Sequence, residues 1–168
     1  MEHVRSDKNL EFKQLLETHH DKLYWMIRRI IIAHHDAEDV LQNTWIKIHK
    51  GLPGFQGKSS IKTWMYRIAY NESMRFLSKK RKNLPLDEVD HKYLETLQND
   101  VYYSSTDLTQ KLHQALATLT EKERQIFNLK YYEAFKFKMI SNILGMNINS
   151  VKTIYYRAEQ KMKQKLVQ

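Results

Sequence analysis

Three carboxylates lie close together in the sequence, at Asp36, Glu38 and Asp39. Closely spaced carboxylates can hold Mg²⁺ for phosphodiester cleavage, so these residues are the first candidates for catalytic chemistry. On a helix, Asp36 and Asp39 lie on one side whereas Glu38 points elsewhere, so the three do not converge on one ion. We therefore expect Asp36 to cap a helix and Asp39 to complement the dipole of its first turn.

Histidine pairs are the second candidate for metal chemistry, at His19 with His20 and at His34 with His35. Adjacent residues on a helix point about 100° apart, so neither pair has the spacing of metal ligands. Cys 0 excludes a disulfide framework, thiolate–zinc sites and a cysteine nucleophile. The sequence therefore predicts no metal site, no cofactor and no catalytic residues, and we expect a protein that is not an enzyme.

Aromatic and cationic side chains alternate in the middle of the first half of the chain. Phe55 lies in a loop, and the segment after it carries Trp64, Tyr66, Tyr70 and Phe76 among Lys58, Lys62, Arg67, Arg75 and 79–82. Such surfaces hold single-stranded nucleic acid by stacking bases and pairing phosphates, and Asn71 could read a base edge. Packing is the alternative, and we assign Tyr66, Tyr70 and Phe76 to it. Phe55 has less reason to be buried, because its loop is polar and flanked by glycines.

The C-terminal segment has the layout of a helix-turn-helix, with the turn at residues 145–147. At about 100° per residue, one side of its last helix is apolar. The apolar set is Val151, Ile154, Tyr155, Ala158, Met162 and Leu166. The opposite side carries Asn149, Lys152, Thr153, Tyr156, Gln160 and Lys163, with Ser150 and Arg157 at its edge. These side chains suit base edges and phosphates, although an amphipathic helix with a solvated polar face is the alternative.

The elements that position these residues are all helical in the sequence pattern. We expect a helix over 10–32, bent or interrupted at 19–21, and an Asp36-capped helix that stops at the breaker 51–54. A Ser60-capped helix should cover 61–82. Helical patterning returns at Asp107, followed by helices over 121–132, with a Thr120 and Glu123 capping box, and 137–144, ended by Gly145. Asn147 or Asn149 should cap the last helix, which reaches about Leu166.

Composition and charge support an all-α protein with two small domains. Gly 4 and Pro 2 are too few for β-sandwiches, barrels or glycine-rich phosphate loops. The longest apolar run, 30–33, is too short for membrane insertion, and the N-terminus lacks a secretory signal, so we expect a cytoplasmic protein. The net charge of +9 divides into +7 over 1–82, −5 over 83–110 and +7 over 111–168. A soluble protein with an uneven surface is one explanation, and a bipartite nucleic-acid binder is the other.

We therefore predict domains at 1–82 and 107–168, joined by a flexible acidic linker at 83–106. Residues 36–82, DAEDVLQNTWIKIHKGLPGFQGKSSIKTWMYRIAYNESMRFLSKKRK, resemble conserved region 2 of extracytoplasmic-function sigma factors in the sigma-70 family. Residues 112–166, LHQALATLTEKERQIFNLKYYEAFKFKMISNILGMNINSVKTIYYRAEQKMKQKL, look like their region 4. The resemblance implies a subunit that binds core RNA polymerase, directs it to promoters and helps to open promoter DNA. It also adds an anti-sigma factor to the candidate partners.

The resemblance further implies roles for individual residues, carried over by position. Those matching the family helix that packs on the polymerase clamp coiled coil are Asp39, Gln42, Asn43 and Trp45. Phe55 and Asn71 match positions that capture a flipped base of the −10 element, and Lys62 and Trp64 lie near the upstream duplex edge. The residues matching the face that reads the −35 element are Ser150, Lys152, Thr153, Tyr156 and Arg157. Departures from the family pattern occur at Asn43, Met139 and Ile154, which bear on affinity and promoter sequence.

A dimeric helix-turn-helix regulator with an N-terminal helical effector domain is the alternative function. Such a protein needs a ligand pocket or a receiver-like site in its first half. The first half here offers instead a basic, aromatic helix, which an effector domain does not need. The sequence therefore favours the sigma factor.

Overall fold

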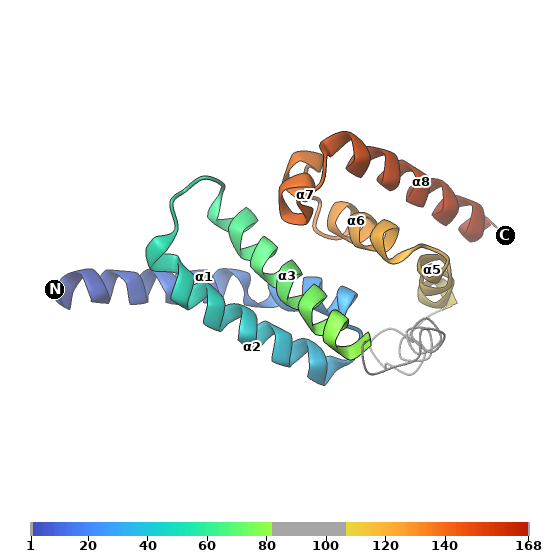
Figure 1. Cartoon of the computed structure of the whole chain (residues 1–168). Coiled ribbons are helices and arrows are strands. Elements are labelled where there is room, and N and C mark those ends of the chain that lie inside the picture. Colours follow the sequence, from blue (N-terminus) through green and yellow to red (C-terminus); the bar gives the residue numbers. More distant parts are fainter. Residues whose placement is uncertain (1, 82–106, 168) are drawn as a thin grey trace. The chain divides into compact units, whose positions relative to one another are not determined.

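The computed structural model describes residues 2–81 and 107–167, and every regular element in these two ranges is a helix. The chain divides into two compact units, Met1–Leu77 and Ser78–Gln168 (Figure 1). The prediction of an all-α fold with two small helical domains is confirmed. The linker predicted at 83–106 lies outside the described residues, as does Lys82. None of the described helices is long and apolar enough to cross a membrane.

The first unit is built from three long helices and one short turn of 3₁₀ helix. They are α1 (Glu2–Ile30), α2 (His34–Gly51), η1 (Leu52–Gly54) and α3 (Ile61–Arg81). The helix α1 runs through residues 19–21, so the interruption expected there does not occur. In this uninterrupted stretch, the exposed His20 ring stacks on Trp45 of α2 with 6.4 Å between ring centroids.

The core of the first unit draws on all three long helices. Fully buried side chains include Leu23 and Ile27 of α1, Ile48 of α2, and Met65 and Tyr66 of α3. Leu23 and Ile27 are four residues apart, as are Met65 and the buried Ala69, which matches the apolar periodicity of a helix. Tyr66 and Ala69 of α3 are completely buried, which confirms that Tyr66 packs rather than faces solvent.

The helix starts of the first unit are fixed in two different ways. Ser60 caps α3, because its Oγ accepts a hydrogen bond from the Thr63 backbone N–H at 3.1 Å. The expected cap at Asp36 is wrong: α2 begins two residues earlier, after Ala33, whose side chain makes no capping bond. Asp36 lies instead in the first turn, where a carboxylate still complements the helix dipole.

The second unit contains four shorter helices, and most of their ends agree with the sequence. They are α5 (Asp107–Ala117), α6 (Glu121–Tyr131), α7 (Phe137–Leu144) and α8 (Ile148–Val167). Gly145 ends α7 with φ 64 and ψ 33, a left-handed conformation that glycine adopts without strain. Asn147 caps α8, because its Oδ1 accepts a hydrogen bond from the Asn149 backbone N–H at 2.8 Å.

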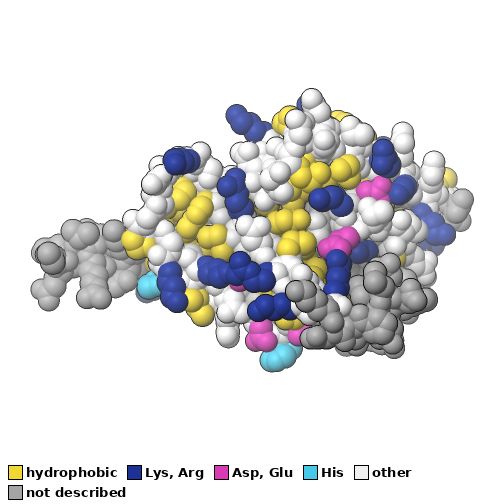
Figure 2. Space-filling view, viewed as in Figure 1, with side chains coloured by type: hydrophobic (Ala, Val, Ile, Leu, Met, Phe, Trp, Pro, Cys, Tyr) yellow, Lys and Arg dark blue, Asp and Glu magenta, His cyan; other side chains and the backbone are white. Residues whose placement is uncertain are grey.

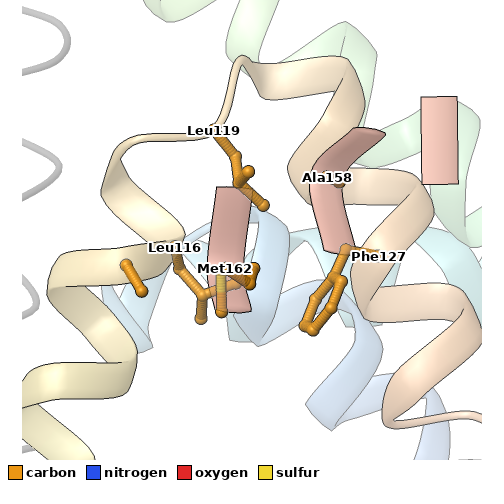
Figure 3. Close-up of a cluster of buried hydrophobic side chains, with 6 residues drawn as sticks. Leu116, Leu119, Phe127, Ala158 and Met162 are labelled. Atoms are coloured by element: carbon orange, nitrogen blue, oxygen red, sulfur yellow. The ribbon is translucent and has the colours of Figure 1, made fainter. Parts of the chain in front are cut away.

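A compact apolar cluster holds α5, α6 and α8 together (Figure 3). Leu116 and Leu119 come from the end of α5 and the turn after it, Phe127 from α6, and Ala158 and Met162 from α8. The predicted apolar side of α8 is thus confirmed at Val151, Ala158 and Met162. Leu166 is 39% exposed, contrary to its assignment to that side, because the buried stripe of α8 ends at Met162.

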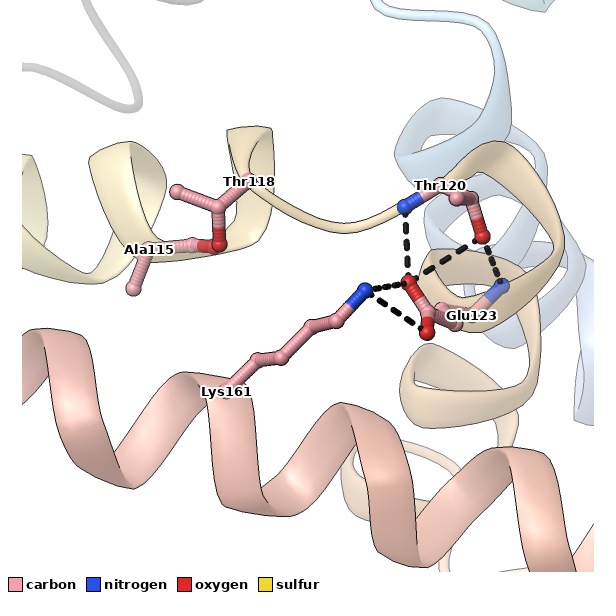
Figure 4. A network of polar contacts seen from close by, with 5 residues as sticks. All are labelled: Ala115, Thr118, Thr120, Glu123 and Lys161. Atoms are coloured by element: carbon pink, nitrogen blue, oxygen red, sulfur yellow. Dashed lines mark hydrogen bonds and ion pairs between the residues drawn. The ribbon is translucent and has the colours of Figure 1, made fainter.

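A partly buried ion pair ties the start of α6 to α8 (Figure 4). The Lys161 ammonium lies 2.9 Å from both carboxylate oxygens of Glu123, which is only 4% exposed. The same carboxylate accepts from the Thr120 backbone N–H at 2.9 Å, which confirms the capping box. Burial alone would raise the pKa of Glu123, but the hydrogen bonds from Lys161 and Thr120 outweigh it and lower the pKa.

We predict that Glu123→Gln destabilises the second unit by about 1–3 kcal/mol, because charged hydrogen bonds at a buried site are lost. A carboxylate with a lowered folded-state pKa stabilises the fold above its unfolded pKa, and this contribution disappears as the pH falls through the folded value. Hydrogen exchange of amides in α6 and α8 at neutral and acidic pH measures both effects.

The matched control is Glu159→Gln, which removes an exposed pair with Lys163 at 3.3 Å and should cost less than about 0.5 kcal/mol. Equal protection in the two variants, or a difference from wild type that does not shrink at acidic pH, would contradict the role of Glu123.

Candidate nucleic-acid interface

One exposed face of α2 carries three of the residues that the sequence singles out. Asp39, Gln42 and Asn43 are all exposed, and their spacing of three and four residues places them together. Ile46, seven residues after Asp39, extends the same face and is 51% exposed. Ile46 is not among the predicted site residues, although its spacing of seven residues from Asp39 places it on the same face of the helix. The face therefore combines one carboxylate, two amides and an apolar side chain.

Trp45 does not belong to this exposed face. It lies about 120° around the helix from Asp39 and is 7% exposed. Its ring packs edge-on against Phe12 of α1 at 5.8 Å and parallel to His20 at 6.4 Å. Trp45 thus packs α2 against α1 and lies behind the exposed face, and the polymerase contact that the resemblance implies for it stays a prediction.

The carboxylates of α2 pair with histidines on the same helix. The Glu38 carboxylate lies 3.4 Å from His34 Nε2, and that of Asp39 lies 3.9 Å from His35 Nε2. In residues 2–81 and 107–167, no three His, Asp or Glu side chains are arranged to hold a metal ion. Asp39 keeps 55% of its side chain exposed, so its charge remains available at the surface.

An aromatic pair lies where the loop at residues 55–60 meets α3. The Phe55 and Trp64 rings are 5.1 Å apart and tilted by 43°. Gly51 at the end of α2 lies directly under the Trp64 indole, because a Cβ placed on it would come within 2.9 Å of Trp64 Cζ2. Gly57 turns the loop with a φ of +67, which favours glycine. Phe55 and Trp64 are both half-buried, so each ring keeps some solvent exposure.

Asn71 lies on the same face of α3 as Trp64, two turns further along the helix. Arg67 lies between them at helical spacing and is exposed, like Asn71. Arg67 is predicted only as one of the interleaved cations, and in the structure it lies on the same face of α3, between Trp64 and Asn71. Lys62 is positioned differently, with its ammonium 5.8 Å from the Tyr66 ring centroid.

A shared carboxylate fixes α3 against α2 beside Asn71. Glu72, with 10% of its side chain exposed, pairs with Lys47 of α2, and its Oε1 also lies 3.1 Å from Arg75 Nη1. Near Lys62, at the start of α3, burial lowers the pKa of His19, and the positive charges of Lys22 and Lys62 lower it further. The cationic character of this surface thus comes from lysine and arginine rather than from His19. Figure 2 shows Lys and Arg side chains gathered beside hydrophobic ones on this unit.

The second unit presents the predicted recognition residues on α8. The turn before α8 is closed by the Ser141 hydroxyl, which donates to the Met146 carbonyl at 2.6 Å. All the residues carried over to this face are exposed: Ser150, Lys152, Thr153, Tyr156 and Arg157. The Thr153 hydroxyl donates to the Asn149 carbonyl at 2.9 Å, so an outside group can use only its acceptor side.

Aromatic rings surround the middle of α8. Phe137 of α7 lies 5.4 Å from Tyr155 and 6.0 Å from Tyr156, between ring centroids. Burial raises the pKa of Tyr155, and Glu159, Tyr156 and Tyr131 raise it further, so this hydroxyl remains protonated at neutral pH. Tyr131, at the end of α6, is 60% exposed. It is not among the site residues predicted from the sequence.

Comparison with known families places both units in one class of protein. Residues 15–83 match Sigma-70 region 2, and residues 109–162 match Sigma-70, region 4. In Bacillus subtilis (strain 168), the RNA polymerase sigma factor SigV is 32% identical over 128 residues, covering 76% of this chain and 74% of its own. The ECF RNA polymerase sigma factor SigW of the same organism is 26% identical over 165 residues, covering 92% and 88%.

Solved structures agree with this assignment. The sigma factor RpoE from Bartonella quintana, solved in complex with the anti-sigma factor NepR, superposes with a TM-score of 0.69 at 25% identity, covering 93% of this chain and 96% of that one. CnrH, solved with the cytosolic domain of CnrY, has the same fold with a TM-score of 0.65 at 19% identity, covering 91% and 85%. The chain belongs to the extracytoplasmic-function (ECF) sigma factors of the sigma-70 family. The resemblance drawn from the sequence is confirmed.

We predict that Gly51→Ala displaces the Trp64 indole, because the added methyl group cannot fit beneath it. With 5-fluorotryptophan incorporated, the ¹⁹F resonance of Trp64 should shift while those of Trp25 and Trp45 remain in place. Gly54→Ala is the control, since a Cβ there meets nothing within 4 Å. An unmoved Trp64 resonance in the Gly51 variant would show that the ring does not depend on this contact.

Proposed function

We propose that this chain is a promoter-specificity subunit of bacterial RNA polymerase, with no catalytic chemistry of its own. It binds the core enzyme, directs it to promoters and helps to separate the strands, and it works in the cytoplasm, where that enzyme transcribes. The observation that carries the proposal is the occurrence of region 2 and region 4 matches in this order on one chain. The alternative of a dimeric regulator is not favoured, because the first unit matches region 2 rather than an effector domain.

The α2 face is our candidate for the polymerase contact. Asp39 offers a negative charge to the basic clamp coiled coil that the family resemblance implies, and Gln42 and Asn43 offer hydrogen bonds. Ile46 adds an exposed apolar side chain of the kind that anchors the centre of an interface. Trp45 takes part indirectly, because its packing against Phe12 holds the helix that carries the face.

The surface from Phe55 to Asn71 is our candidate for the −10 element. The half-buried Phe55 and Trp64 rings can stack with a base that has left the duplex, and the exposed Asn71 amide can hydrogen-bond to a base edge. Lys62 and Arg67 lie on the same helix and can neutralise nearby phosphates. Because Trp64 rests on Gly51, the stacking surface is formed before DNA arrives.

The exposed face of α8 is our candidate for the −35 element. Its hydroxyl, amide and cationic groups match the side chains that read base edges and bind phosphates in the major groove. An anti-sigma factor is a further proposed partner, supported by the similar sigma factor RpoE from Bartonella quintana, which was solved in complex with the anti-sigma factor NepR. We propose the predicted boundaries 1–82, 83–106 and 107–168 for the two functional domains and their linker.

The purified chain, added to core polymerase and genomic fragments, should give run-off transcripts from discrete start sites. Asp39→Arg should reduce co-elution with core polymerase by at least about tenfold, because a positive charge would face a basic partner. Run-off products should fall with it. Asp21→Arg, the same change at an exposed position of α1, is the control and should co-elute like wild type. Unaltered co-elution of the Asp39 variant would remove the α2 face from the polymerase contact.

Phe55→Ala and Asn71→Ala should each lower open-complex formation more than closed-complex binding. For Phe55, loss of the stacking ring costs about 1–3 kcal/mol, or roughly 5- to 150-fold in the opening equilibrium. Permanganate reactivity of unpaired thymines measures opening, and retention of promoter DNA at low temperature measures closed binding. If both steps decline equally, these residues do not capture a base.

A further inference from the structure

A continuous set of aromatic rings joins α6 and α7 to the recognition helix in the second unit. We call it the aromatic wall, and it consists of Phe127, Tyr131, Phe137, Tyr155 and Tyr156. Phe127 contacts Tyr131 and Tyr155 in near-parallel geometry, with centroids 5.3 Å and 6.2 Å away. Tyr155 lies 5.5 Å from Tyr156, so the rings connect without a gap from the last turn of α6 to the outer face of α8.

Exposure divides the wall into a supporting part and a presented part. Phe127 is 5% exposed and belongs to the apolar cluster that fixes α6 against α8. Tyr131 and Tyr156 are 60% and 54% exposed, so more than half of each residue's surface is open to solvent. Since Tyr131 stacks on Phe127, its position is fixed by packing rather than by the loop that follows it.

The surroundings of the wall are cationic. Residues 111–168 carry 11 basic and 4 acidic side chains. Lys130, adjacent to Tyr131, places its ammonium 5.0 Å from the Phe137 centroid, and Lys136, Lys138 and Arg157 are exposed. Two carboxylates lie near the wall in the sequence: Glu133, two residues after Tyr131, and Glu159, which lies 3.3 Å from Lys163 and 3.5 Å from the Tyr155 hydroxyl.

We propose that Tyr131 is a DNA-contacting residue that donates its hydroxyl to a backbone phosphate at the edge of the upstream promoter element. The contact would extend the DNA surface from α8 to the end of α6, with Lys130 beside it. This inference rests on the proposed function of the α8 face. Tyrosine hydroxyls are among the groups that position proteins on the phosphate backbone without reading sequence. Tyr131 would thus set how α8 is oriented in the groove.

Duplex DNA fits this wall better than a protein partner does. The presented groups are two tyrosine hydroxyls flanked by lysines and an arginine, which suits a row of phosphates. Protein interfaces are depleted in lysine, whereas Lys130, Lys136 and Lys138 lie beside the presented rings. The aromatic wall also includes Tyr156, which lies between Thr153 and Arg157 on the candidate recognition face.

The test uses holoenzyme formed from the full chain and core polymerase, with a promoter fragment recovered by run-off transcription. Tyr131→Phe keeps the ring and its packing but removes the donor, so it should weaken binding by about three- to tenfold. The salt dependence of binding should stay the same, because no cation is lost, whereas Lys152→Ala should reduce the slope by about one. Ethylation of one upstream phosphate should weaken the wild type but not the Tyr131 variant.

Tyr132→Phe is the matched control, since it removes a hydroxyl from the neighbouring, half-buried residue and should leave binding and the ethylation pattern unchanged. Unchanged affinity and ethylation pattern in Tyr131→Phe would overturn the inference. So would weaker retention on core polymerase with an intact DNA pattern, which would identify a protein as the occupant. If Lys152→Ala and Arg157→Ala also leave the upstream footprint unaltered, the proposed function of the α8 face fails as well.

Discussion

In the second unit, the buried stripe of α8 packs against Phe127 and the end of α5, and this contact decides which side chains the candidate recognition helix presents. Val151, Ala158 and Met162 are 0–3% exposed. Because helical side chains are fixed about 100° apart, burying these three directs Lys152, Tyr156 and Arg157 outward. The Glu123–Lys161 pair secures the same contact from the side. A sigma factor needs this rigidity, since base reading depends on a fixed helix in the groove.

In the first unit, packed aromatic side chains fix which side chains the candidate surfaces present. Trp45 packs behind the α2 face, and Trp64 rests on Gly51 beside Phe55, so both candidate surfaces are supported from within. Glu72 joins α2 to α3 through Lys47, which couples the candidate polymerase contact to the candidate −10 surface. Each surface is therefore shaped before a partner binds, and binding need not order the side chains that support it.

Local sequence signals predicted the helices, although not every detail of them. Helix ends at Ser60, Thr120 and Gly145 were predictable because capping depends on neighbouring residues alone. The interruption expected near His20 does not occur, and the His20 ring contacts a tryptophan of another helix, which no local signal could indicate. Asp36 failed as a cap because α2 starts earlier, at His34, with no capping side chain before it.

The sequence by itself determined the helical class, the two basic blocks and the outward side of α8, since periodicity and charge depend only on residue order. Only the tertiary structure decided that Trp45 is buried while Ile46 is exposed, and that Leu166 lies beyond the core. It alone brought Tyr131 into a line of rings with Tyr156, residues from different helices. Burial and contact between distant residues depend on how helices pack, which no local pattern encodes.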